Sequence, residues 1–329
     1  MKEKNDLRQL VKDVVTKIGV PNKASYEATI DKLDIDLFRM FDFLPDLMMT
    51  VCSYVVKETF TETLGEYDED GRFITFSFNN LFSAPHTEEN KNPSRLPDDV
   101  VPNALVFSSS RKREILFRKG VRMRQIVVRV NKNYLHHLLK EEAAGFDFLF
   151  ADNHSFFIDE ILTDDLLRIV NDIAVPRSEP ILVGFHYRLK ATELLFHLFT
   201  NLKKRTKARQ LRISEAELRA VYQVRDKITS SLTEFSSIDD LKKIAGINEV
   251  KLRRLFNQVF GTGFFNYFQH FRMAEAARLL REENLSVSEV GYKLGFENLS
   301  HFSRIFKHYN GHLPKKYAKV WADDRGSSR

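Results

Sequence analysis

The chain has 329 residues, which predicts about two domains at roughly 100–200 residues each. Hydrophobic residues make up 43% and charged residues 29%, so the chain can build cores and bulk disorder is excluded. It contains no run of about 18 apolar residues, and its charged N-terminus lacks the apolar run of a secretory signal, so no membrane span is expected. Cys52 is the only cysteine, which excludes an intrachain disulfide and a four-thiolate zinc site and indicates a reducing, cytoplasmic location.

The net charge of +6 is distributed unevenly along the chain. Residues 203–329 hold 25 Lys and Arg against 14 Asp and Glu, a net charge of +11, whereas residues 1–202 hold 26 against 31, a net charge of −5. A basic C-terminal third attached to an acidic remainder is typical of a module that binds a polyanion such as nucleic acid. A basic surface that only aids solubility is the alternative interpretation.

The first predicted elements are a helix and a set of strands. Residues 7–18 place apolar side chains at steps of three and four, which predicts an amphipathic helix that Gly19 and Pro21 end. From 45 to 130 short β-rich runs alternate with turn-rich stretches, and the segment 83–103 is expected to be a surface loop. The runs are Thr50–Val56, Arg72–Phe78, Ala104–Phe107, Glu114–Phe117 and Arg122–Val130. Many short strands with turns indicate an antiparallel barrel or sandwich.

Helical patterns follow between residues 131 and 202. One helix is expected over 156–173 and a second over 183–202, because both segments carry broad apolar faces at helical spacing. Part of these faces is expected to pack on the strands and part to form a twofold interface.

A linker and a further helix are predicted next. The basic run 203–209 has no apolar periodicity, and Ser214 with Glu217 forms a capping box that opens a helix over 215–232. We therefore predict three parts. They are residues 1–205 (β-rich over 45–130 and helical over 131–202), a linker or connecting helix over 206–226, and a C-terminal domain over 227–329.

The last hundred residues contain an internal repeat. The segment Ser237–Ile247 aligns with Ser286–Phe296: each begins with an N-cap serine, places an apolar residue four positions later, and turns at a glycine. Each turn, at Gly246 or Gly295, leads into an amphipathic helix with a single apolar stripe. Two such helices joined by a short glycine turn are the helix-turn-helix pattern.

A helical wheel gives the outer side of the second helix in each repeat. Taking Leu252 and Phe302 as the buried references, the residues opposite the apolar stripe or on its flanks are Val250, Arg253, Arg254 and Asn257 in the first repeat, and Ser300, His301, Ser303, Arg304 and Lys307 in the second. Arginine can bind guanine and asparagine can bind adenine through two hydrogen bonds each. A solvated helix face is the alternative for any isolated arginine.

The segment between the repeats, Phe264 to Glu283, is expected to form one continuous helix, since it has no proline or internal glycine. About 20 residues at a rise of 1.5 Å give roughly 30 Å. Successive major grooves on one face of DNA lie roughly 34 Å apart. A rigid connector of this length can hold two recognition helices in adjacent major grooves of one duplex.

Ordered motifs accompany the repeat: Ala245-Gly-Ile247 with Leu252–Phe256, Phe271–Leu280, Val287–Gly291, and Gly295–Lys307. The stretch 227–325 that contains them resembles the DNA-binding domain of the AraC/XylS family of bacterial transcription regulators. This resemblance implies DNA contacts by Val250, Arg253, Arg254, Ser300, His301, Ser303 and Arg304. The sequence departs from the family pattern at Leu313, where a small polar residue usually precedes the proline, and at Val250, where several members carry a larger or polar side chain.

The resemblance also implies the organisation of the remaining chain. It predicts an α+β protein, with an N-terminal small β-barrel (cupin-like) sensing domain followed by helices and a C-terminal all-α double helix-turn-helix domain. It implies double-stranded operator DNA, a second copy of the chain and a small-molecule effector as partners, with RNA polymerase as a further candidate and no membrane.

Other features of the first two-thirds have alternative explanations. His136 and His137 are adjacent and point to different sides of a helix, so no metal and no cofactor is predicted. A basic band over 111–124 could hold an anionic ligand, or could be solvated strand positions. The phenylalanines clustered over 146–157 could line an aromatic pocket, or could form a core.

These observations predict a ligand-responsive, sequence-specific transcription regulator with no catalytic residues. The alternatives are a cupin-type metal-dependent enzyme with a DNA-binding appendage, and an architectural DNA-binding protein without a ligand.

Overall fold

The structure, a computed structural model, describes residues 9, 11–12, 23–43, 46–64, 71–79, 102–108, 113–150, 156–174, 181–205, 213–283 and 285–326. The chain divides into two compact units. The sheet unit comprises residues 1–82, 103–159 and 165–212, and the helical unit comprises 83–102, 160–164 and 213–329. Each unit is described by itself, and β8 (Phe157–Ile161) and α5 (Asp164–Ala174), whose ends lie within 160–164, are described with the sheet unit.

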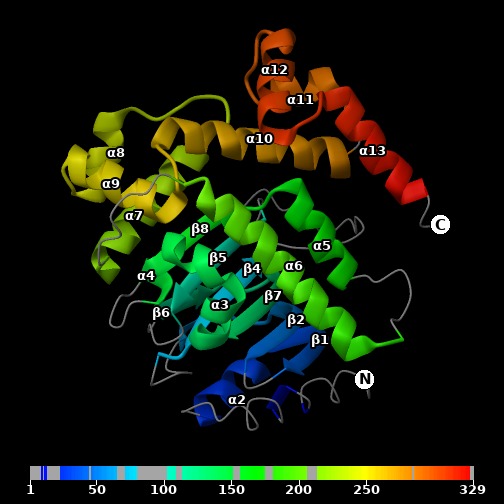
Figure 1. Ribbon diagram of the computed structural model, residues 1–329. Coiled ribbons are helices and arrows are strands. Elements are labelled where there is room, and N and C mark those ends of the chain that lie inside the picture. The colour runs from blue at the N-terminus through cyan, green and yellow to red at the C-terminus, as the bar shows by residue number, and fades with distance from the viewer. Residues whose placement is uncertain are drawn as a thin grey trace. The chain divides into compact units, whose positions relative to one another are not determined.

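The sheet unit contains a six-stranded sheet with the order β1-β2-β7-β4-β5-β8 and a two-stranded sheet, β3-β6 (Figure 1). The strands are β1 (Leu33–Phe43), β2 (Leu47–Val56), β3 (Phe60–Leu64), β4 (Phe73–Asn79), β5 (Asn103–Ser108), β6 (Arg113–Phe117), β7 (Arg122–Asn131) and β8 (Phe157–Ile161). The pairs β1–β2, β2–β7, β7–β4, β4–β5 and β3–β6 are antiparallel. All five sequence-predicted strands are therefore confirmed, with ends within a few residues.

Alternation along the strands gives the large sheet a fully buried face. Ile126 and Val128 on β7 pair with Phe78 and Phe76 on β4, and all four side chains are 0% exposed. Side chains two residues apart point to the same side of a strand, so these residues form one continuous apolar layer.

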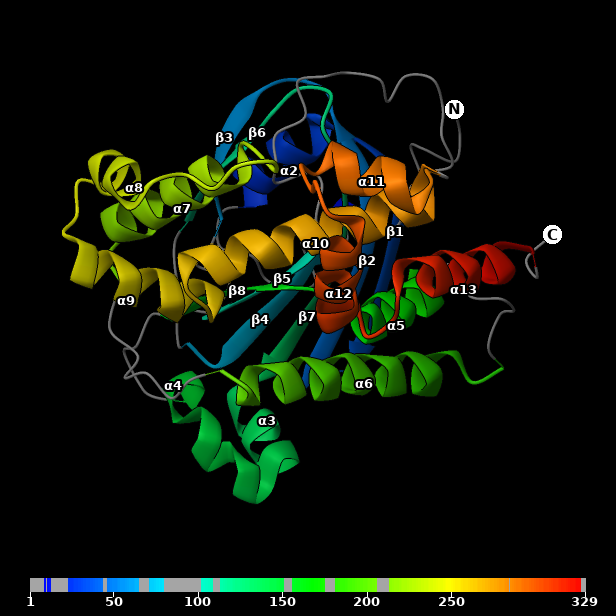
Figure 2. The ribbon, with the colours of Figure 1, turned by 90° about the horizontal axis from the view of Figure 1, so that it is seen from above.

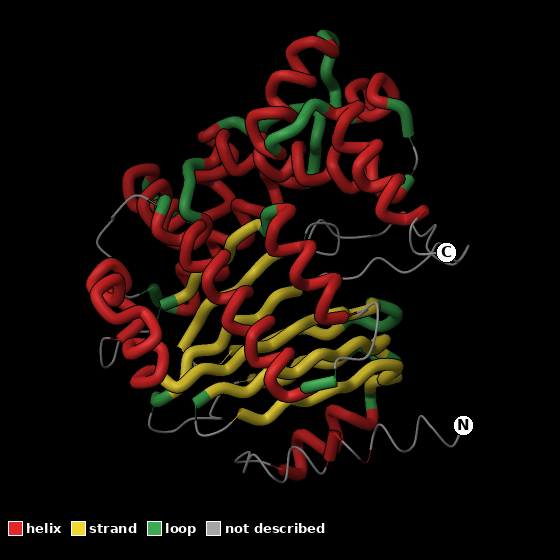
Figure 3. Tube along the Cα trace, turned by 45° about the vertical axis from the view of Figure 1, so that its right-hand side comes forward, coloured by secondary structure: helices red, strands yellow, loops and turns green. Residues whose placement is uncertain are grey.

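Helices supply the rest of the sheet unit. They are α2 (Lys23–Asp31), α3 (Lys132–Leu139), a 3₁₀ helix (Lys140–Phe146), α4 (Asp147–Phe150), α5 (Asp164–Ala174) and α6 (Val183–Lys203). Helix α6 lies across the buried face of the large sheet (Figure 3). Its Tyr187 stacks on Phe41 of β1 at 3.9 Å between ring centroids, and its Phe199 meets Phe76 of β4 edge-on at 5.8 Å. The helix predicted over 183–202 is thus confirmed.

Two expectations for the sheet unit are wrong. Residues 157–161 form β8, not the start of a helix over 156–173, and the helix begins only at Asp164. Asp159 on this strand accepts a hydrogen bond of 2.8 Å from Asn103 of β5. Among the described residues β1 and β8 are the two ends of the strand order, so the large sheet is open and the expected closed barrel is not formed. A cupin-like origin of this unit stays a prediction.

Other predictions lie partly or wholly outside the described residues. Of the helix over 7–18, residues 9, 11 and 12 are described and are helical. The loop predicted over 83–103 is described only at its last two residues, and residues 206–212 of the linker are not described.

Cys52 is buried in the sheet unit, and burial raises the pKa of its thiol to about 12, which suits a structural cysteine. No described helix combines the length and apolarity needed to cross a bilayer.

The helical unit is built around one long helix. Its helices are α7 (Glu215–Thr229), α8 (Ile238–Ala245), α9 (Glu249–Phe260), α10 (Phe264–Glu282), α11 (Val287–Lys293), α12 (Leu299–Asn310) and α13 (Pro314–Gly326). Figure 2 shows α10 between two groups of helices, with α7, α8 and α9 at one end and α11, α12 and α13 at the other. The predicted helices over 215–232 and 264–283 and the two helix-turn-helix repeats are all present.

The caps explain why the repeats begin and end where they do. Ser237 and Ser286 accept hydrogen bonds from the backbone of Asp240 and Glu289, and so begin α8 and α11. Gly246 and Gly295 hold φ angles of +62° and +78°, a left-handed backbone that glycine adopts at little cost. Both glycine turns therefore follow the prediction made from the repeat.

Candidate DNA-binding surface

The first helix-turn-helix, α8 with α9, is held by an apolar core. Leu241 on α8 and Leu252, Leu255, Phe256 and Val259 on α9 are each at most 1% exposed. The Phe256 ring meets Phe260, Phe264 and Tyr267 at centroid distances of 4.6 to 5.4 Å, which ties α9 to the start of α10. The predicted stripe of α9 is therefore its buried side, and its opposite side faces away from this core.

The second helix-turn-helix, α11 with α12, has an equivalent core. Phe302 and Phe306 on α12 are fully buried against Val290, Leu294 and Met273, together with other apolar side chains of α10 and α13. His270 on α10 stacks on Tyr309 of α12 at 5.3 Å, and burial lowers the pKa of His270 to about 4, so the ring is neutral at physiological pH. Helix α12 is thereby fixed to the connecting helix.

A short loop between α7 and α8 joins the two cores. Leu232 packs against the core of the second helix-turn-helix, and Phe235 meets Phe265 and Phe268 of α10 at 5.6 and 5.5 Å. A Cβ atom added at Gly295 would lie 2.9 Å from Thr233 Cα. The second turn is therefore packed directly against this loop, in addition to its attachment through α10.

Arg272 fixes the second turn to α10. Its guanidinium donates a hydrogen bond of 2.6 Å to the carbonyl of Leu294 and lies 4.0 Å from the centroid of the Phe296 ring. The side chain is buried, and this burial lowers the pKa of Arg272. Stacking by a planar guanidinium and a hydrogen bond to backbone are contacts that lysine cannot reproduce together.

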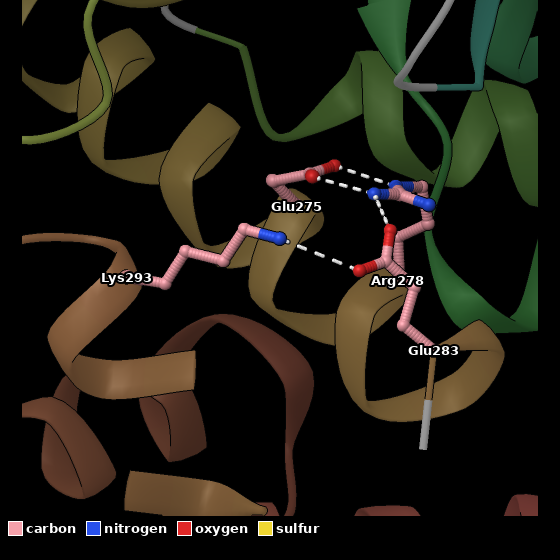
Figure 4. Close-up of polar contacts among 4 residues, drawn as sticks. All are labelled: Glu275, Arg278, Glu283 and Lys293. Carbon is pink, nitrogen blue, oxygen red and sulfur yellow. Dashed lines mark hydrogen bonds and ion pairs between the residues drawn. The ribbon is translucent and has the colours of Figure 1, made fainter. Parts of the chain in front are cut away.

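A charged network connects the end of α10 with α11 (Figure 4). Arg278 donates two hydrogen bonds of 2.8 Å to the carboxylate of Glu275 and one of 2.8 Å to Glu283. Lys293 at the end of α11 lies 3.4 Å from the other oxygen of Glu283. Both helix-turn-helix units are therefore attached to α10 by several independent contacts.

On α9, the four predicted DNA-contacting residues lie as the helical wheel places them. Val250 is 81% exposed, Arg253 and Arg254 are exposed, and Asn257 is half-buried. Arg253 is not free in solution: its Nε donates to Glu249 at 2.7 Å, and its guanidinium lies 5.4 Å from the Phe264 ring. The Glu249–Arg253 pair spans one helical turn and could have been predicted from its spacing.

On α12, the five predicted residues also lie on or beside the exposed side. Ser300, His301, Arg304 and Lys307 are exposed, and Ser303 is half-buried. His301 meets Phe296 at 6.1 Å between ring centroids. Among the residues that the structure describes, none forms a hydrogen bond or ion pair with the side chain of Arg304 or Lys307. These side chains are accessible to DNA, and their contacts with DNA stay a prediction.

Sequence reasoning missed one contact at this surface. Lys251, the neighbour of Val250, lies 2.7 Å from Glu217 of α7. The two residues are far apart in sequence, and no local pattern indicates their pairing.

No group of three or more His, Cys, Asp or Glu residues suited to a metal occurs within the described parts of the chain.

Comparison with known proteins identifies the helical unit. A family model described as a helix-turn-helix domain matches residues 241–319. The HTH-type transcriptional regulator GlxA of Rhizobium meliloti is 32% identical over 95 residues, 29% of this chain and 29% of GlxA. The HTH-type transcriptional activator AarP of Providencia stuartii is 32% identical over 90 residues, 27% of this chain and 67% of AarP. This chain belongs to the AraC/XylS family of transcription regulators.

A solved structure of a probable AraC family regulator from Rhodopseudomonas palustris is also similar. It is 24% identical, covers 31% of this chain and 97% of that chain, and has a TM-score of 0.28. The chain spans 29% of the length of GlxA, so the activity of the whole protein and the role of the sheet unit are matters for proposal.

Proposed function

We propose that this protein is a sequence-specific transcription regulator that binds double-stranded DNA through α9 and α12. The observation that carries the proposal is the pair of recognition helices whose exposed sides bear Arg254 and Arg304, both mounted on α10. The 19 residues of α10 span about 28 Å at 1.5 Å per residue, close to the spacing of adjacent major grooves. RNA polymerase is the partner through which such a regulator would act.

We further propose a division of labour along the chain. Residues 1–205 form a sensing and dimerising part that binds a small-molecule effector. Residues 206–226 connect this part to residues 227–329, which bind DNA in the cytoplasm. This proposal includes a relationship of residues 1–205 to cupin-like domains. A shift of melting temperature in a screen of metabolites would identify the effector, because a ligand that binds the folded state stabilises it. Stoichiometric iron or manganese in the purified protein would favour the enzyme alternative instead.

The experiment that tests the proposed function is selection of bound duplexes from a random DNA pool. The full chain is expected to enrich a bipartite site with two elements about one helical turn apart. If the full chain still retains DNA at the salt concentration used but enriches no sequence, sequence-specific regulation is contradicted.

Arg304→Ala is expected to weaken binding to the selected site by about 1–3 kcal/mol and to relax the preference at the base pairs beneath α12. Arg304 is exposed on α12, and arginine distinguishes guanine through O6 and N7. Competition binding with singly substituted sites measures both effects. Arg168→Ala, an exposed arginine of α5, removes the same charge from the sheet unit and is the matched control. An equal loss on every sequence would make Arg304 a phosphate contact only.

The proposed homodimer uses α6. Near the start of this helix and along one side of it, large apolar side chains are exposed: Ile181 by 99%, Leu182 by 66%, Phe185 by 62%, Leu189 by 54% and Phe196 by 65%. A contiguous apolar patch of this kind is rare on a monomer. Phe185 and Phe196 have their midpoint near Leu189, so a twofold axis there would place Phe185 of one copy beside Phe196 of the second.

Phe196→Glu is expected to raise the dissociation constant of the dimer about 30-fold or more, since buried aromatic anchors contribute at least about 2 kcal/mol. Sedimentation velocity at micromolar concentration measures the change. Leu116→Glu, at a comparably exposed leucine (51%) on β6, is the control and is expected to leave the dimer intact. Equal sedimentation of wild type and both variants would exclude α6 as the interface.

A further inference from the structure

The two recognition helices correspond residue by residue, because their caps are equivalent. Asn248 and Asn298 begin α9 and α12 through side-chain hydrogen bonds, and Gly261 and Gly311 end them in the left-handed region. In this alignment Lys251 takes the place of His301. Lys251 therefore lies on the flank of α9 from which, by the symmetry of the repeat, a side chain can reach DNA.

Lys251 is nevertheless occupied by a carboxylate from another helix. Its Nζ lies 2.7 Å from Oε1 of Glu217, in the first turn of α7. The second oxygen of Glu217 accepts a hydrogen bond of 2.8 Å from the backbone N–H of Ser214, and the Ser214 hydroxyl accepts one of 3.2 Å from the backbone N–H of Glu217. This capping box fixes the carboxylate in position before DNA arrives.

The Glu217 carboxylate is ionised throughout the physiological range. The hydrogen bond from Lys251, together with that from the Ser214 backbone, lowers the pKa of Glu217 to about 2. A DNA phosphate that approached Lys251 would have to replace this carboxylate and would lie close to its negative charge. The pair as a whole carries no net charge for DNA to attract.

The second recognition helix, α12, shows no such restraint among the described residues. Leu299 stands where α9 has Glu249, the residue that pairs with Arg253. Within the described chain no carboxylate pairs with Arg304 or Lys307 on α12. Of the two recognition helices, therefore, only α9 has acidic partners for its basic side chains. Glu217 and Glu249 neutralise Lys251 and Arg253, two of the three basic side chains of α9.

We propose that Glu217 is a specificity-determining residue that keeps Lys251 away from the phosphate backbone. This proposal rests on the proposed function. Phosphate contacts strengthen binding to every sequence alike, whereas base contacts discriminate between sequences. By withholding one phosphate contact, Glu217 lowers the affinity of the protein for non-specific DNA and leaves discrimination to side chains such as Val250 and Arg254.

The test compares the salt dependence of binding to a random-sequence 40-base-pair duplex for the full chain and its variants. Glu217→Gln preserves the capping box, since glutamine also serves at this position. It is expected to make the slope of log affinity against log salt more negative by about 0.9, because one more lysine then binds phosphate. Between 50 and 200 mM salt the variant should therefore lose about 3.5-fold more affinity than wild type.

Lys251→Gln separates the proposal from a simple gain of charge. In the wild-type background it is expected to leave the slope unchanged, and in the Glu217→Gln background it should restore the wild-type slope. Glu215→Gln is the matched control: it removes the same charge from the same turn, but Glu215 pairs with Arg219 of its own helix. Its slope is expected to stay near that of wild type.

Two results would overturn the proposal. If Glu217→Gln left the slope unchanged, Lys251 would not have been released. If Lys251→Gln alone made the slope less negative by about 0.9, Lys251 would already bind phosphate in the wild type. Both presuppose that the wild-type chain binds the duplex. Absence of any wild-type binding at 50 mM salt would instead reject the proposed function, and this proposal with it. Circular dichroism melting confirms that each variant is folded.

Discussion

Arg278→Ala is expected to lower the free energy of unfolding of the helical unit by about 3–5 kcal/mol, the cost of removing one partner from a buried ion pair. The guanidinium binds Glu275 through two hydrogen bonds and Glu283 through one. The side chains of Arg278 and Glu275 are only 17% and 9% exposed, so water cannot fully replace the lost guanidinium. Hydrogen exchange of the backbone amides of α10 and α12 in the full chain measures the free energy of opening.

Lys293→Ala tests the exposed end of the same network. Its ammonium lies 3.4 Å from Glu283 and the side chain is 56% exposed, so a loss of less than about 1 kcal/mol is expected. Arg278→Lys should recover only part of the stability, because an ammonium cannot donate two parallel hydrogen bonds to Glu275. Equal losses for Arg278→Ala and Lys293→Ala would contradict the view that the buried Arg278–Glu275 pair, and not the exposed Lys293, supplies most of the stability of this network.

The helical unit could be predicted almost completely because its signals are local. A serine cap, an apolar stripe and a glycine that ends a turn act within a few residues, and the repeat presents each signal twice. The exposed positions of α9 and α12 follow from the helical period alone, so Val250 and Arg304 could be assigned to the outer side from sequence. What remained hidden was the pairing of Lys251 with Glu217, which depends on how α7 packs against α9.

The sheet unit shows what local patterns cannot decide. The run Phe157, Ile158 and Ile161 fits the buried side of a helix as well as a strand buried on both faces. Its neighbour in the sheet, β5, lies far away in the sequence, and that partner makes it a strand. Closure of a barrel is equally non-local, since it depends on hydrogen bonds between the strands at the two edges. The five strands with clear local patterns, β2, β4, β5, β6 and β7, were therefore predicted, whereas β1, β3 and β8 and the order of the strands were not.

Gly295→Ala is expected to destabilise the helical unit far more than Gly246→Ala, although both glycines occupy the same place in the repeat. Both hold positive φ angles, and alanine in the left-handed region costs roughly 1–2 kcal/mol. At Gly246 a Cβ atom would meet nothing within 4 Å, so this cost is the whole effect. At Gly295 the Cβ atom would lie 2.9 Å from Thr233 Cα, which is backbone and cannot turn aside.

We therefore expect Gly246→Ala to cost about 1–2 kcal/mol and Gly295→Ala about 3 kcal/mol or more, as overpacking adds 1–3 kcal/mol to the backbone strain. Hydrogen exchange in α8 and α11 of the full chain measures both losses. Thr233→Gly should rescue Gly295→Ala only in part, because it removes the side-chain contacts at 2.9 and 3.1 Å and leaves the contact with Cα. Equal losses at the two glycines would mean that the loop at Thr233 yields freely, and that α10 alone holds the two recognition helices at their spacing.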